Sequence, residues 1–205
     1  MGTRNSRSPS PTAELREQLA QEAARLMVER GIEDYGLAKR KAAERLGVRA
    51  PGALPSNGEI QECLAERQRI FEPLDHENRL ANLRRLAADV MAELEEFRPR
   101  LVGAVLAGTA TIASPIELHA FGDSPELVGA ALERRYGGVR DCERRYRFGG
   151  DRVERVPGFS FARDGERVEV LVFGERGAHH APLSPVDRRP MRRAALSAVL
   201  ALLDG

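Results

Sequence analysis

Apolar residues recur every three or four positions through the first part of the chain, which is the spacing of one helix face. The first such run predicts a helix that begins at Thr12 and ends before Gly31, because a hydroxyl can cap the start and a glycine follows the end. The apolar positions of this helix are Leu15, Leu19, Ala23, Leu26 and Met27. The chain is therefore predicted to begin its folded part as a helix.

End signals predict three more helices before the pattern changes. Asp34 is a capping residue for a second helix. Ser56, followed three residues later by Glu59, forms a capping box for a third. Asp75 opens the longest helix, whose apolar stripe is expected to face the core, and Pro99 ends it.

After Pro99 the apolar period changes from helical spacing to the alternation of strands. Asp164 and Gly165 form a two-residue hairpin signal between two of these alternating runs. Helices are predicted over 124–136 and, at the end of the chain, over 191–203. The predicted strands cover residues 101–106, 115–121, 142–148, 152–162 and 166–173.

This order of elements predicts an α+β protein, with an N-terminal helical bundle followed by a small mixed sheet and its flanking helices. Residues 1–11, rich in Ser, Pro and Arg, predict a disordered tail. Residues 12–74 then form the helical region, and residues 75–205 form the α/β domain. A chain of this length buries enough surface to fold without a disulfide or a metal.

Composition and charge narrow the class of protein further. Apolar residues make up 42% of the chain, charged residues 31%, and the formal net charge is +1, so overall charge favours neither nucleic acid nor an anionic membrane as a partner. No apolar run is long enough to span a bilayer, and the polar N-terminus lacks the apolar segment of a signal peptide. Cys63 and Cys142 lack metal-ligand spacing. We therefore expect a cytoplasmic protein with no membrane partner.

Three short segments of the second half carry residues suited to phosphoryl or nucleotidyl transfer. Gly108 and Thr109 lie in a run of small residues after the first predicted strand, where backbone amides can approach a triphosphate. Glu117 and His119, two residues apart on the next strand, share one face, and Glu169 lies in a later apolar strand. Convergent carboxylates can hold the divalent cations that bind the attacking and leaving oxygens.

The order of these segments resembles the DNA polymerase beta-like nucleotidyltransferase superfamily over residues 79–175. Members of that superfamily carry a Gly-Ser or Gly-Gly turn after the first strand, an acidic pair on the next, and a third acid on a later strand. The resemblance implies a nucleotidyltransferase-like domain that binds a nucleoside triphosphate and a divalent cation, Mg²⁺ or Mn²⁺. It assigns the nucleotide phosphates to Gly108 and Thr109, and catalysis and metal binding to Glu117, His119 and Glu169.

Two positions depart from the superfamily pattern. Thr109 stands where Ser or Gly is usual, and it keeps a hydroxyl. His119 stands where an acid is expected, and an imidazole is a poor ligand for Mg²⁺, which prefers oxygen. In an active site His119 would be a third metal ligand or a general base. The metal site is therefore interpreted as partly degraded.

The residues leave three functions open. The first is metal-dependent transfer of a nucleotide from a nucleoside triphosphate to an RNA or protein acceptor. The second is a non-catalytic scaffold, derived from the same fold, that binds a nucleotide, RNA or protein. The third is a hydrolase that uses a single softer metal on His119 and the two glutamates.

Basic clusters are the candidate contacts for phosphate groups. Lys39-Arg40-Lys41 lies on the second predicted helix and could contact a nucleic-acid backbone, but the acids nearby favour a plain solvated helix surface. In the strand predicted over 142–148, Arg144 and Tyr146 share one face, so only part of that arginine cluster can form a single patch.

Overall fold

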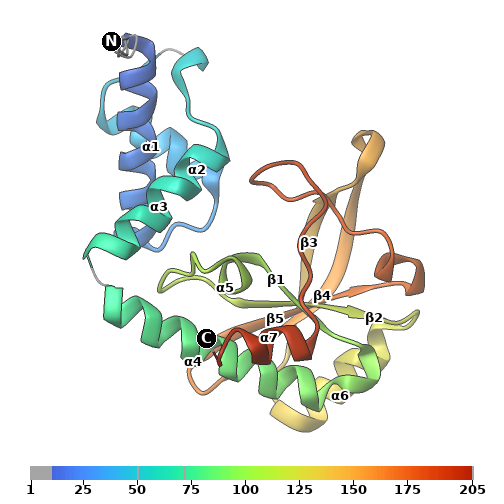
Figure 1. Ribbon diagram of the computed structural model, residues 1–205. Coiled ribbons are helices and arrows are strands. Elements are labelled where there is room, and N and C mark those ends of the chain that lie inside the picture. Colours follow the sequence, from blue (N-terminus) through green and yellow to red (C-terminus); the bar gives the residue numbers. More distant parts are fainter. Residues whose placement is uncertain (1–10, 50, 72, 205) are drawn as a thin grey trace, which may run out of the picture. The chain divides into compact units, whose positions relative to one another are not determined.

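The computed structural model describes residues 11–49, 51–71 and 73–204, and the chain divides into two compact units. The first unit extends to Ile70, and the second begins at Phe71. Figure 1 shows helices in the first unit and a sheet with helices in the second. The tail predicted for residues 1–11 lies, apart from Pro11, outside the described residues.

The first unit is built on the helices α1 (Pro11–Arg30), α2 (Tyr35–Arg45) and α3 (Asn57–Phe71). A short 3₁₀ turn, Pro51–Ala53, lies between α2 and α3. The buried apolar side chains that the helices share are, among others, Leu19, Ala23, Met27, Ala38, Ala42, Ile60 and Leu64. These are the helically spaced apolar positions, so the periodicity of the sequence sets this core.

The predicted caps of α2 and α3 are confirmed. The carboxylate of Asp34 accepts a hydrogen bond from the backbone N–H of Leu37 at 2.6 Å. The Ser56 hydroxyl accepts from the backbone N–H of Glu59 at 3.1 Å, and the Glu59 carboxylate accepts from the backbone N–H of Ser56 at 2.6 Å. These bonds satisfy helix-end donors that have no partner within the helix.

The second unit carries a five-stranded mixed sheet in the order β1-β2-β5-β4-β3. The strands β2 and β5 are parallel, and the other neighbours are antiparallel. Asp164 and Gly165 both have positive φ, as the predicted two-residue hairpin between β4 and β5 requires. The strands are β1 (Arg100–Val102), β2 (Ile116–Phe121), β3 (Arg140–Arg147), β4 (Val153–Arg163) and β5 (Glu166–Phe173).

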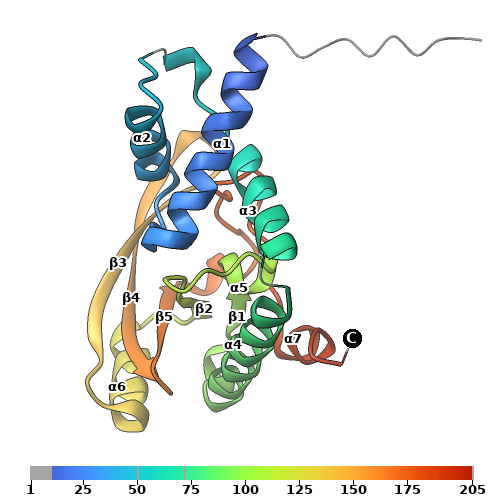
Figure 2. The ribbon, with the colours of Figure 1, turned by 90° about the vertical axis from the view of Figure 1, so that its left-hand side faces the viewer.

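Four α-helices accompany this sheet in the described part of the second unit: α4 (Pro73–Glu93), α5 (Gly103–Ala107), α6 (Pro125–Tyr136) and α7 (Leu196–Ala201). Helices α4 and α7 lie side by side, as both ribbon views show (Figures 1 and 2), and α6 packs against β4. A 3₁₀ turn, Glu95–Phe97, separates α4 from β1. The apolar faces of these helices therefore pack against the sheet and against one another.

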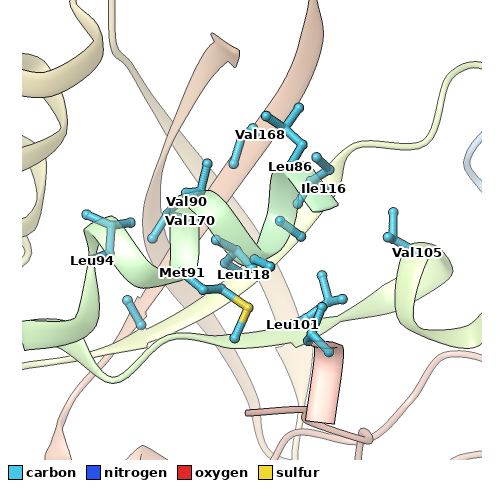
Figure 3. Close-up of a cluster of buried hydrophobic side chains, with 14 of the residues drawn as sticks. Leu86, Val90, Met91, Leu94, Leu101, Val105, Ile116, Leu118, Val168 and Val170 are labelled. Carbon is cyan, nitrogen blue, oxygen red and sulfur yellow. The ribbon is translucent and has the colours of Figure 1, made fainter. Parts of the chain in front are cut away.

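One face of the sheet is apolar and packs against helices. Ile116 and Leu118 of β2, together with Val168 and Val170 of β5, point toward Val90 and its neighbours on α4 (Figure 3). All of these side chains are almost completely buried. Because successive strand residues point to opposite faces, the residues between them lie on the other side of the sheet.

Two predicted elements differ in the structure. The strand predicted over 101–106 ends at Val102, because Gly103 adopts a φ of 69° and the chain continues as α5. The helix predicted over 191–203 is reduced to α7. Ala194, which that helix was to include, instead exchanges two 2.9 Å backbone hydrogen bonds with Leu101 and extends the edge of the sheet.

The predicted fold class is confirmed: helices precede a mixed five-stranded sheet in an α+β chain. Among the described residues, no helix combines the length and the apolar character needed to cross a membrane.

Candidate functional site

Ionisable side chains gather on the sheet face opposite the helix-packed core, which we call the polar face. Glu117 and His119 reach it from β2, Glu169 from β5, and Arg144 and Tyr146 from β3. On β2 and β5 these residues alternate with apolar ones that point into the core, whereas on β3 they alternate with exposed charged residues. The three residues predicted for the site, Glu117, His119 and Glu169, are thus brought to one place.

Glu117 and Glu169 are aligned partners on the parallel strands β2 and β5. The guanidinium of Arg144 lies between their carboxylates: Nη1 donates to Glu117 Oε2 at 2.9 Å, and Nη2 donates to Glu169 Oε2 at 2.6 Å. Glu117 is 8% exposed and Glu169 is 9% exposed, so neither carboxylate has free access to water. Arg144 therefore supplies the cation that this carboxylate pair needs.

His119 is fully buried and uses both of its ring nitrogens. Its Nδ1 accepts a hydrogen bond from Arg193 Nε at 3.1 Å. Its Nε2 lies 3.1 Å from the hydroxyl oxygen of Tyr146, and that hydroxyl donates to Glu117 Oε1 at 2.6 Å. Because Arg193 and the tyrosine hydroxyl both act as donors, the ring proton must sit on Nε2 and point at the tyrosine oxygen.

The electrostatics of the polar face keep His119 neutral and Glu117 charged. Burial, together with the charges of Arg193 and Arg144, lowers the pKa of His119 below its ordinary value. Burial alone would raise the pKa of Glu117, but the nearby His119, whose Nε2 lies 3.6 Å from Oε1, and the charge of Arg144 outweigh burial and lower that pKa. Burial and the neighbouring Glu117 charge raise the pKa of Tyr146, so its hydroxyl stays a donor.

Arg193 enters the polar face from the segment between β5 and α7. Its Nη1 donates to the backbone oxygen of Gly177 at 2.5 Å, and its guanidinium lies 5.0 Å from the ring centres of both Phe121 and Phe173. The Nη2 atom is buried, and the described residues offer it no hydrogen-bond partner. Burial lowers the pKa of Arg193 to about 10, which still leaves it charged near neutral pH.

The predicted metal-ligand set does not fit a divalent cation in this arrangement. The Nδ1 lone pair of His119 is directed at Arg193, and its Nε2 carries the proton, so the imidazole has no free lone pair. The guanidinium of Arg144 occupies the space between the two carboxylates. Within the described parts of the chain, no group of three or more His, Cys, Asp or Glu side chains has an arrangement that could hold a metal ion.

The glycine nearest to the carboxylates is Gly103, whereas sequence reasoning placed the glycine turn at Gly108 and Thr109. A Cβ atom added to Gly103 would lie 3.4 Å from Glu117 Oε2. Gly108 instead ends α5 with a φ of 81°, and its carbonyl oxygen lies 3.0 Å from His76 Nε2. Thr109 is buried, and its backbone N–H bonds within the α5 turn to Ala104. The turn that directly follows β1 is therefore at Gly103.

Sequence reasoning did not include three residues of the site. Arg144 and Tyr146 carried one usable signal, because the strand period places both on one face of β3. Arg193 belongs to a basic cluster at Arg188, Arg189, Arg192 and Arg193, but nothing in the sequence indicated His119 as its partner, which it contacts across 74 positions and from a segment predicted to be helical. Pairing across the sheet, which the sequence does not encode locally, brings Arg144 and Tyr146 to the carboxylates. Arg193 reaches His119 from outside the strands.

The basic cluster of the second predicted helix lies on α2 of the first unit. Arg40 and Lys41 are exposed there, and Lys39 is half-buried. Burial lowers the pKa of Lys39, with the charge of Glu59 acting in the opposite direction.

No protein-family model, curated protein or solved structure matches the chain.

Proposed function

We propose that the second unit is a nucleotidyltransferase-like domain that binds a nucleoside triphosphate on its polar face without catalysing metal-dependent transfer. The single observation that carries the proposal is the position of Arg144, which bonds to both Glu117 and Glu169. The two carboxylates that the resemblance assigns to metal binding are aligned on neighbouring strands, and both accept hydrogen bonds from the Arg144 guanidinium. We therefore expect the domain to bind a nucleoside triphosphate but not to transfer its nucleotide.

The arrangement of the sheet supports the likeness to nucleotidyltransferases. The acid of β2 and the acid of β5 are neighbours on parallel strands, and the glycine that follows β1 lies beside the first of them. This is the order of turn, acid and later acid that the resemblance implies, with Gly103 in the place given to Gly108. Two separate strands and a turn thus converge at one position of the polar face.

The charge of the polar face supports a phosphate ligand. Three guanidinium groups, from Arg144, Arg167 and Arg193, contact the two carboxylates or the neutral His119. Arg140, which is exposed, follows the same face of β3. Arginine donates two parallel hydrogen bonds to a phosphate group, and cations in excess of carboxylates favour an anionic ligand.

Nucleotide binding is measured by isothermal titration calorimetry with ATP, CTP, GTP and UTP, first in EDTA and then with Mg²⁺ or Mn²⁺. We expect at least one triphosphate to bind in EDTA, and Arg140→Gln to weaken this binding. Arg155→Gln is the matched control, because Arg155 forms an ion pair with Glu143 and has a side chain that is 70% exposed. If none of the four triphosphates gives a binding heat, with or without metal, triphosphate binding is rejected.

Metal-dependent nucleotidyl transfer is the second candidate, and the aligned pair of Glu117 and Glu169 is the observation that favours it. The side chain of Arg144 is 35% exposed, so it can swing toward solvent. The chain is incubated with α-labelled nucleoside triphosphates, Mn²⁺ or Mg²⁺, and RNA or protein acceptors. Incorporation that disappears in Glu117→Gln would establish the transferase and reject the non-catalytic domain.

A further inference from the structure

The cation between Glu117 and Glu169 belongs to the chain itself. Arg144 donates one hydrogen bond to each carboxylate, at 2.9 and 2.6 Å. The remaining oxygen of Glu117 accepts from Tyr146 at 2.6 Å, and the remaining oxygen of Glu169 lies 3.5 Å from Arg167 Nε. Three of the four carboxylate oxygens therefore accept a hydrogen bond, and the fourth, Glu169 Oε1, has the Arg167 cation beside it.

The alignment of Glu117 and Glu169 on neighbouring strands requires a cation between their carboxylates. Aligned residues on neighbouring strands lie about 5 Å apart, so two charged carboxylates in this position repel each other unless a cation separates them. Both glutamates are largely buried, which weakens the screening of that repulsion by water. A metal ion or a guanidinium can meet the requirement, and the structure has the guanidinium.

We propose that Arg144 is a built-in counter-cation that closes a two-carboxylate divalent-cation site formed by Glu117 and Glu169. Removal of its guanidinium opens that site to Mn²⁺ or Mg²⁺. His119 is not a ligand of this site, because its Nδ1 lone pair accepts from Arg193 and its Nε2 carries the proton. The ligands are carboxylate oxygens, which suit both of these hard cations.

A tethered cation competes strongly with one in solution. Arg144 is fixed on β3 at hydrogen-bond distance from both acids, so a metal ion must displace a group whose effective local concentration is high. No other described cation replaces it: Arg167 approaches Glu169 alone, at 3.5 Å, and is exposed. Substitution of Arg144 is therefore the change that frees the carboxylate pair.

The test is a titration of the full chain with MnCl₂, followed by calorimetry and by electron paramagnetic resonance of the free ion. Wild type is expected to show no saturable binding. Arg144→Gln is expected to bind one Mn²⁺ at least about tenfold more tightly than wild type, and the added Glu169→Gln substitution is expected to abolish this binding. Arg155→Gln, which removes an exposed arginine that pairs with Glu143, is the matched control and should behave like wild type.

Two results overturn the proposal. One is that Arg144→Gln, shown to be folded by circular dichroism and cooperative unfolding, binds no more Mn²⁺ than wild type. The other is that wild type binds one Mn²⁺ tightly and loses it in Glu169→Gln, because Arg144 then does not close the site. The wild-type titration keeps the proposal testable even where Arg144→Gln does not fold. The titrations contain metal alone, so their outcome is independent of nucleotide binding.

Discussion

Glu117 and Glu169 lie directly opposite each other on the parallel strands β2 and β5, and their carboxylates share the guanidinium of Arg144. The two acids come from strands that adjoin in the sheet, but their cation comes from β3 at its edge. Arg144 therefore links the two sides of the sheet across its polar face. We therefore expect Glu117, Glu169 and Arg144 to determine both the stability of the polar face and its ability to bind a metal ion.

Removal of the guanidinium is expected to destabilise the second unit. Arg144→Ala leaves two largely buried carboxylates without their shared cation. A fully buried pair that loses one partner costs several kcal/mol, and we reduce this to about 2 kcal/mol because the Arg144 side chain is partly exposed. Urea unfolding followed by circular dichroism measures the change in the free energy of unfolding.

The control for this loss is Arg155→Ala, which removes an exposed ion pair with Glu143. Its effect is expected to stay below about 0.5 kcal/mol, since exposed pairs contribute little. Equal losses in Arg144→Ala and Arg155→Ala would contradict a stabilising role for the shared guanidinium.

Stability is expected to fall as pH drops through 6.5, because His119 resists protonation in the folded chain. Burial first, and the charges of Arg193 and Arg144 next, hold its pKa below the ordinary value of 6.5. Below that pH the unfolded chain takes up a proton that the folded chain does not, so acid favours unfolding, by at most about 1.4 kcal/mol per pH unit. The unfolding free energy is measured from pH 7.5 down to pH 5.

The contribution of His119 is isolated by substitution. His119→Gln keeps one acceptor and one donor and should flatten the slope between about pH 6.5 and 5. The exposed control His180→Gln should retain the wild-type slope. A second fall is expected below pH 4.5 in wild type and in His180→Gln, because the pKa of Glu117 is also lowered and its carboxylate is protonated there in the unfolded chain first. A wild-type curve that is flat through pH 6 would reject the neutral, buried imidazole.

The tautomer of His119 is a separate prediction. With Arg193 donating to Nδ1, the proton is expected on Nε2. Long-range proton–nitrogen correlation spectra at pH 7 distinguish the two nitrogens by their chemical shifts. A protonated Nδ1 would mean that the hydrogen bond with Arg193 is not formed, and it would return the imidazole to the set of candidate metal ligands.

The sequence predicted those elements whose signals are local. The cap at Asp34, the capping box of Ser56 and Glu59, and the turn at Asp164 all depend on residues close in sequence, and the structure has each of them. The proximity of Glu117 and Glu169 was expected from the resemblance to nucleotidyltransferases, in which an acidic pair on one strand and an acid on a later strand share a site. It did not follow from periodicity, which gives the face of each residue but not which strands adjoin.

Non-local contacts explain what the sequence did not predict. Arg144 was recognisable as a residue on the same strand face as Tyr146, but only the order of strands in the sheet places it against the two acids. The helix predicted over 191–203 was wrong in its first part because Ala194 pairs with Leu101, far away in sequence. A pairing of this kind outweighs the local helical preference of an apolar segment.

Gly108, from the expected phosphate turn, and Gly103, which follows β1, give a matched pair of variants. Gly103 and Gly108 both have positive φ, so alanine at either position is expected to cost about 1 kcal/mol of backbone strain. Only at Gly103 does the added Cβ approach Glu117, at 3.4 Å from Oε2, whereas Gly108 has its nearest atoms at 3.7 Å on Arg84 and Leu80.

Triphosphate binding is therefore expected to weaken in Gly103→Ala and to remain near wild type in Gly108→Ala. Calorimetry measures the affinity, and thermal unfolding verifies that the two variants lose similar stability. Loss of binding in Gly108→Ala alone would return the phosphate turn to Gly108 and Thr109.

Arg193 is expected to hold the segment between β5 and α7 against the polar face. It links His119 to the backbone of Gly177 and lies over the rings of Phe121 and Phe173. In Arg193→Ala, amide hydrogen exchange should become faster over residues 175–193, and the free energy of unfolding should fall by about 1–2 kcal/mol. The exposed neighbour Arg192 provides the control variant, Arg192→Ala.

A second measurement separates this role from simple packing. The charge of Arg193 helps to lower the pKa of His119, so that pKa should rise in Arg193→Ala and stay unchanged in Arg192→Ala. The methionine variant Arg193→Met keeps most of the apolar contact with the two phenylalanine rings but lacks the charge, so it should recover part of the stability and none of the pKa effect. If Arg193→Met instead restored both, packing alone would explain the contribution of Arg193.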